Sequence, residues 1–197
     1  MTAGTIDRLM ALLGAAALGV VLSWPFVAGI EQPGDALIRD TIRLALAFYL
    51  AAALAMLRLR GSQWEARSGL GRLARWCWTW ACVIFLTHVA MAFHYFHHWS
   101  HAHAVEHTRA VSGFGPGIYV SHTCSVVWTL DMLSWWLAPA WYAVRSPWVD
   151  RVLHAFMAFL IFNGTVVFED GLIRWAGAAM FLVLAIAWLR HGFLGSR

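Results

Sequence analysis

Six long apolar runs dominate this sequence of 197 residues and limit what it can fold into. They cover approximately residues 9–30, 41–57, 76–97, 117–141, 152–168 and 171–189. A hydrocarbon core about 30 Å thick requires about 17 to 25 apolar residues of helix, and only helices or closed barrels satisfy the backbone there. The runs therefore predict an all-α fold for a polytopic integral membrane protein, as a single domain with a bundle of about six transmembrane helices.

The composition agrees with this fold class. Hydrophobic residues make up 61% of the chain and charged residues 12%, whereas an ordinary soluble domain is about half apolar and about a quarter charged. The net charge is +4, but the arginines lie between the apolar runs and form no continuous basic face with interleaved exposed aromatic residues, so nucleic acid is excluded as a partner. The expected partner is the lipid bilayer.

The arginines predict the orientation, because basic residues are retained on the cytoplasmic side of a membrane. The connection between the second and third runs holds Arg58, Arg60, Arg67, Arg72 and Arg75. The next connection on that side and the two chain ends add Arg145, Arg151, Arg8, Arg190 and Arg197, while the other side has Arg39, Arg43, Arg109 and Arg174. This asymmetry predicts that both termini lie in the cytoplasm (N-in/C-in) and that the protein resides in the plasma (inner) membrane.

Two local features add to the predicted architecture. The last two runs are joined by Glu169, Asp170 and Gly171, so those helices should be antiparallel neighbours joined by a tight turn. Several tryptophans cluster toward the predicted cytoplasmic ends and indicate an interfacial aromatic belt: Trp76, Trp78, Trp80, Trp135, Trp136, Trp141 and Trp148.

Eight of the ten histidines lie between His88 and His122, at the predicted outer side of the bundle. Four of them fall on one helical stripe in an i, i+3, i+4, i+7 relation, namely His94, His97, His98 and His101. Imidazole suits Zn, Cu and Fe, and ligand pairs on helices commonly use this spacing. His122, about one turn into the fourth run, is a further candidate ligand. The connection before it offers His107 and His103, which can take part only if this connection folds back.

The histidine-rich segment 94–122 therefore predicts a site for a transition metal ion (Fe, Cu or Zn) on the outer side. The stripe depends on whether the chain continues as a helix beyond the membrane, which the sequence leaves open. The alternative is that these histidines form hydrogen bonds to water and lipid headgroups.

The stretch from His94 to His98 has the form His-x-x-His-His. It resembles one histidine box of the membrane-bound di-iron desaturases and hydroxylases. The resemblance covers these five residues. Those enzymes place several such boxes on the cytoplasmic side, whereas this chain has one, which is predicted to face outward. No residue role is carried over from that family.

Two ionisable residues fall near the middle of predicted transmembrane helices, His88 in the third and Asp131 in the fourth. A bare charge there costs several kcal/mol unless it is paired or hydrated. Because these helices form a hairpin, His88 and Asp131 are expected to pair. The pair could serve as a proton or ion relay, as a structural contact, or as a cofactor ligand with its supporting carboxylate.

Three functions remain open at this point. The leading hypothesis is a metal-dependent redox enzyme that acts on a lipid-like or small substrate, although the chain has no complete hydrolase or oxygenase signature. The second is a b-type haem protein that transfers electrons, with His94 and His122 as axial ligands. The third is a non-enzymatic metal-handling protein or a structural subunit that packs against other membrane subunits.

Overall fold

The computed structural model describes residues 3–67 and 69–191, and these residues form helices and their connections, without any strand. Each predicted apolar run overlaps one long helix, so the all-α expectation is confirmed. The long helices are α1 (Ala3–Val27), α2 (Pro33–Met56), α3 (Gly69–Met91), α5 (Gly117–Leu137), α7 (Pro147–Phe162) and α8 (Gly171–His191).

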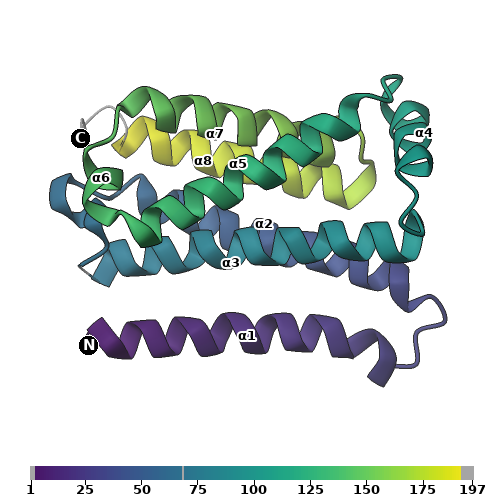
Figure 1. Cartoon of the computed structure of the whole chain (residues 1–197), viewed down its shortest axis with the longest axis horizontal. Helices are drawn as coiled ribbons and strands as arrows, with labels where there is room; N and C mark the ends of the chain where they lie inside the picture. The colour runs from purple at the N-terminus through teal and green to yellow at the C-terminus, as the bar shows by residue number, and fades with distance from the viewer. Residues whose placement is uncertain (1–2, 68, 192–197) are drawn as a thin grey trace.

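Shorter elements lie at the two ends of the bundle (Figure 1). The helix α4 (His101–Ser112) lies across one end. The helix α6 (Pro139–Val144) and the 3-10 helix η1 (Gly61–Glu65) lie at the other, where α1 begins and α8 ends. These are called the α4 end and the α6 end below.

Four helical stretches are long and apolar enough to cross a membrane: Gly4–Val27, Gly69–Phe96, Pro147–Val167 and Gly171–Arg190. They indicate a membrane protein. The other two long helices, α2 and α5, contain 24 and 21 residues. Of these, α2 is more polar because its first half carries Asp35, Arg39, Asp40 and Arg43.

Prolines move two helix boundaries away from the predicted positions. The second helix begins at Pro33 instead of near residue 41, because proline fits the first turn of a helix and Asp35 complements the helix dipole there. The fourth predicted run is split, since Ala138 leaves the helical conformation before Pro139. The result is the separate short helix α6.

Two of the long helices end in π-helical turns. The segment η2 (Ala92–Phe96) continues α3, and the segment η3 (Asn163–Val167) continues α7. A π turn inserts an extra residue into a helix, and such turns are frequent at functional sites. The positions of η2 and η3 therefore help to locate a candidate functional site.

The predicted aromatic belt is wrong for Trp78 and Trp135, which are fully buried. The ring of Trp78 packs against Tyr49 and Trp128, with ring centroids 5.9 and 5.1 Å apart. Trp135 Nε1 donates to the carbonyl oxygen of Trp64 over 2.8 Å. A tryptophan combines a large apolar area with one N–H group, so it fits the core wherever that group finds an acceptor.

The predicted hairpin of the last two helices is confirmed, as α7 and α8 run side by side in opposite directions (Figure 1). Gly177 permits the close approach. A Cβ atom at Gly177 would lie 2.5 Å from Thr165 Oγ1 of η3, so a larger residue would push the two helices apart.

Candidate functional site

A cleft of about 430 Å³ lies between α2, α3, α4 and the α7–α8 hairpin. It is called the α4 cleft below. Both π-helical segments line it, η2 through Ala92 and Phe96 and η3 through Gly164 and Thr165. His88 lines it from α3, about 12 Å along the helix from Phe96 at 1.5 Å per residue. The cleft therefore extends from the α4 end toward the middle of the bundle.

The continuous histidine stripe is not formed, and that part of the metal-site prediction is wrong. The backbone turns away from the helix because His98 and Trp99 have φ angles of 49° and 58°. The Trp99 N–H caps the preceding helix by donating to the Phe93 carbonyl oxygen over 2.8 Å. A new helix, α4, starts at His101 after the capping residue Ser100. Histidines on the two sides of this break do not share a helical face.

The break brings other histidines together. The ring of His97 lies with its centroid 5.3 Å from that of His103 and 5.6 Å from that of His107. His103 and His107 are one turn apart on α4, and Phe96 packs against both rings at 5.6 and 4.6 Å. We call His97, His103 and His107 the histidine cluster. Both His103 and His107 were candidate ligands that required the connection to fold back.

His97 is the buried member of the histidine cluster, with 7% of its surface exposed. Its Nδ1 atom is buried and has no hydrogen-bond partner among the described residues. Burial, and then the neighbouring His103, His107 and His98, lower the pKa of His97 below the ordinary histidine value. A buried, unsatisfied nitrogen costs about 1–3 kcal/mol, and such an exception calls for an explanation, a bound ion among them.

Two further predicted ligands form a separate pair. The rings of His101 and His122 stack with their centroids 5.6 Å apart. The Nε2 atom of His101 lies 3.3 Å from the hydroxyl oxygen of Tyr119. This pair joins the start of α4 to the start of α5. Neither residue lines the α4 cleft.

The remaining predicted ligands, His94 and His98, are exposed. Nδ1 of His94 accepts a hydrogen bond from Trp99 Nε1 over 3.3 Å. The predicted haem axial pair, His94 and His122, therefore consists of residues with different ring neighbours: Tyr95 and Trp99 for His94, and Phe93, His101 and Tyr119 for His122. Binding of haem b stays a prediction.

No three His, Cys, Asp or Glu side chains within residues 3–67 and 69–191 are already arranged as a metal centre. The separations in the histidine cluster nevertheless suit one. Two imidazole nitrogens about 2.1 Å from a single tetrahedral ion place their ring centres about 5 Å apart. The side chains of His103 and His107 are exposed, so they can rotate toward His97 without disturbing the core.

The expected pairing of His88 with Asp131 is wrong. Nδ1 of His88 lies 2.9 Å from the carbonyl oxygen of Ile38 on α2. A carbonyl oxygen can only accept, so Nδ1 carries the hydrogen and Nε2 carries the lone pair. Asp131 instead accepts hydrogen bonds from Trp78 Nε1 over 2.9 Å and from the Tyr142 hydroxyl over 3.1 Å.

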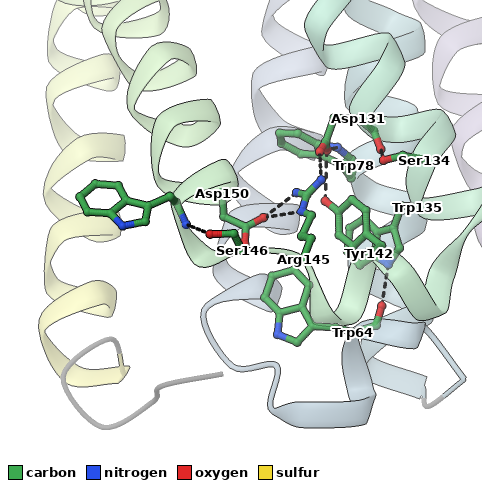
Figure 2. Close-up of polar contacts among 10 residues, drawn as sticks. Trp64, Trp78, Asp131, Ser134, Trp135, Tyr142, Arg145, Ser146 and Asp150 are labelled. Atoms are coloured by element: carbon green, nitrogen blue, oxygen red, sulfur yellow. Dashed lines mark hydrogen bonds and ion pairs between the residues drawn. The ribbon is translucent and has the colours of Figure 1, made fainter.

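The counterion of Asp131 is Arg145, which lies between Asp131 and Asp150 (Figure 2). The nearest nitrogen–oxygen distance is 2.5 Å to each carboxylate. The Arg145 guanidinium also stacks on the Tyr142 ring at 3.7 Å. From the sequence, Arg145 was expected in a connection on the cytoplasmic side. The signal for its role was Asp131 itself, a carboxylate in an apolar helix that requires a cation nearby.

Comparisons of the chain with protein-family models, with curated protein sequences and with solved structures give no significant match. The interpretation of the site therefore depends on its geometry and chemistry.

Proposed function

We propose that the chain is a six-span protein of the plasma (inner) membrane, with both termini in the cytoplasm and the α4 end outside. At 1.5 Å per residue, α2 and α5 are about 36 and 31 Å long, which suffices for a hydrocarbon core of about 30 Å. The α6 end, which includes η1, carries the larger group of arginines. The charged residues of α2 lie in the half that reaches the α4 end, where they can contact water.

We further propose that the histidine cluster binds a transition metal ion, Fe, Cu or Zn. The observation that carries this proposal is the buried, unpartnered Nδ1 atom of His97 beside two more imidazole rings. A metal ion there would satisfy that nitrogen. The lowered pKa of His97 favours the neutral imidazole, which is the form that binds metal.

The surroundings of the cluster favour a reactive site over a purely structural one. His97 and His107 line the α4 cleft together with Glu169, so an ion held by the cluster would face an accessible space. Structural metal sites have all their positions filled by protein, whereas catalytic sites keep one open. The proposed function is metal-dependent chemistry on a small or lipid-like molecule in the cleft, and iron or copper would make that chemistry redox.

Cobalt(II) is a suitable probe because its visible absorption reports the ligands and geometry around it. We expect detergent-purified protein, stripped of metal with a chelator, to bind one Co²⁺ and to show an intense tetrahedral band. His97→Ala and His107→Ala should abolish the band. His94→Ala and His98→Ala are the matched controls, since they remove exposed histidines of the same segment and should leave the band unchanged.

Three results would contradict the proposal. The cluster is not the site if the His94 and His98 variants lose the ion and the His107 variant keeps it. The metal hypothesis is wrong if the folded wild type binds neither Co²⁺ nor Zn²⁺. A Soret band in the protein as purified, lost in His122→Ala but kept in His107→Ala, would favour the haem alternative.

A further inference from the structure

His88 is a polar side chain in the α4 cleft, whose lining surface is mostly apolar. The lining residues from α2 and η2 include the apolar Ile38, Ile42, Leu46 and Ala92 and the charged Asp35, Arg39 and Arg43, and both arginines are paired with Asp40. His88 lies about 12 Å along α3 from Phe96, and therefore well below the histidine cluster. One ion cannot reach His88 and His97 together, so His88 needs an explanation of its own.

The hydrogen bond of His88 determines which of its ring nitrogens can accept a hydrogen bond from a molecule in the cleft. Because Nδ1 donates to the Ile38 carbonyl oxygen over 2.9 Å, Nε2 is a pure acceptor in the neutral ring. The described residues supply no hydrogen-bond partner for Nε2. An apolar molecule that fills the cleft would displace water from this lone pair, at a cost, unless it brings a donor of its own.

We propose that the α4 cleft binds an apolar molecule that carries one hydroxyl group, and that this hydroxyl donates to His88 Nε2. A hydroxyl is a small neutral donor that matches this acceptor. A ketone, an ether or an ester has no hydrogen to donate. A carboxylate would bring a second acceptor to the lone pair, and Arg39 and Arg43 in the cleft lining are already paired with Asp40. The inference rests on the proposed function for the membrane placement of the cleft, but it requires no metal ion.

The experiment compares two ligands that differ in the hydroxyl hydrogen, 4-octylphenol and its methyl ether 4-octylanisole. Radiolabelled forms of both are titrated into the full-length protein in lipid nanodiscs, and empty nanodiscs correct for partition into lipid. We expect the phenol to bind on the order of tenfold more tightly than the ether, the usual effect of one hydrogen bond in an apolar site.

Variants test whether the preference for the phenol over the ether depends on His88 and whether both ligands bind in the α4 cleft. His88→Phe should reduce the ratio of the two affinities to about one, whereas His88→Gln should keep part of it because the amide oxygen accepts. Ala92→Phe fills the cleft and should weaken both ligands. Thermal unfolding verifies that each variant is folded, and His88→Leu replaces His88→Phe if the latter does not fold.

The outcomes separate this inference from the metal proposal. Equal affinities for phenol and ether in the wild type, or a phenol preference that persists in the folded His88→Phe or His88→Leu variant, would overturn it. Phenol binding that Ala92→Phe leaves unchanged would do the same. The titrations are repeated with chelator and with Co²⁺. A phenol preference without a Co²⁺ band would support the hydroxyl site and contradict the metal proposal. A Co²⁺ band without a phenol preference would support the metal proposal and overturn the hydroxyl site.

Discussion

Two buried polar sites, one at each end of the bundle, differ in how completely their groups are paired. At the α6 end, Arg145 and Asp131 have side chains only 3% and 5% exposed and are paired with one another, and Arg145 also pairs with Asp150. At the α4 end, His97 is almost as deeply buried, but its Nδ1 atom has no partner among the described residues. The Asp131–Arg145 site is therefore paired, whereas the histidine cluster leaves one ring nitrogen open; among the described residues, the Nε atoms of Arg72 and Arg75 near the α6 end are also buried without a partner.

The backbone differs less sharply between the ends, because Ala66, which follows η1 at the α6 end, also has a left-handed φ angle of 55°. Both π-helical segments line the α4 cleft, and two consecutive non-glycine residues, His98 and Trp99, adopt the left-handed conformation beside the histidine cluster. Such conformations cost about 1–3 kcal/mol each and are found mainly where function requires them. Complete polar networks specify a fold, whereas incomplete ones beside strained backbone indicate a site. This comparison supports the proposal that the functional site lies at the α4 end.

The largest expected effect concerns the α6 end. Arg145→Ala leaves Asp131 buried without its cation, and removal of one partner of a buried ion pair costs about 3–5 kcal/mol. Denaturant unfolding in detergent should show this loss. The matched control is Arg109→Ala, which breaks the pair with Glu106, whose side chains are 55% and 67% exposed, and should cost less than about 1 kcal/mol.

The comparison of the two ends would fail if Arg145→Ala retained its stability but lost Co²⁺ binding or the phenol preference. The Asp131–Arg145 network would then serve the site and not the fold.

The sequence predicts the helices well because their cause is local. An apolar run of the right length must be helical in a membrane, and each of the six runs overlaps a long helix. The ends of the helices were less predictable. Pro33 and Pro139 shifted two boundaries, and the π turns of η2 and η3 have no simple sequence signal. One extra residue in a helical turn rotates every later side chain about the helix axis. The direction of the His97 side chain could therefore not be derived from residue spacing alone.

The partners of the polar residues were not predictable, because they depend on how separate elements pack. Asp131 was recognised as a residue that needs a partner, but Arg145 reaches it only because α6 turns back after Pro139. His103 and His107 were expected to take part only if the segment folded back. It does so as α4, which Ser100 caps at its start and which ends before Gly113 in the left-handed conformation. Those two residues are the sequence signal that would have revealed the helix.

A smaller effect is expected from pH at the α4 end. Burial and the neighbouring histidines lower the pKa of His97. Below about pH 6.5 the unfolded chain therefore binds a proton at this residue while the folded protein does not. Stability should fall as the pH drops, by up to about 1.4 kcal/mol per pH unit, until the pH reaches the lowered pKa.

Unfolding measured between pH 7.5 and 5 tests this expectation, with His97→Gln as the variant that should lose part of the pH dependence. Arg145 at the α6 end stays charged over this range. An equal pH dependence in wild type and His97→Gln would show that His97 is not the residue responsible.

The smallest expected effect concerns the left-handed backbone at His98. Its measurement tests whether this strained conformation serves the metal site or only ends the helix. His98 has a φ angle of 49°, a conformation that costs an L-residue about 1–2 kcal/mol but costs glycine nothing. His98→Gly should therefore stabilise the protein by about 1 kcal/mol or less, after the extra entropy of glycine in the unfolded chain is subtracted. Ala102→Gly, at an exposed position within α4, is the matched control and should destabilise by about as much.

The Co²⁺ affinity of the same variant completes the test. If His98→Gly is stabilised and binds Co²⁺ as the wild type does, the left-handed turn only directs α4 across the bundle, and the histidine cluster contains every ligand that the segment contributes. If the stability rises while Co²⁺ affinity falls, the imidazole of His98 is itself a ligand, and the strained conformation is retained because it turns that ring toward the ion. A loss of stability would mean that the His98 side chain supports the turn, and the strain argument would then fail for this end of the bundle.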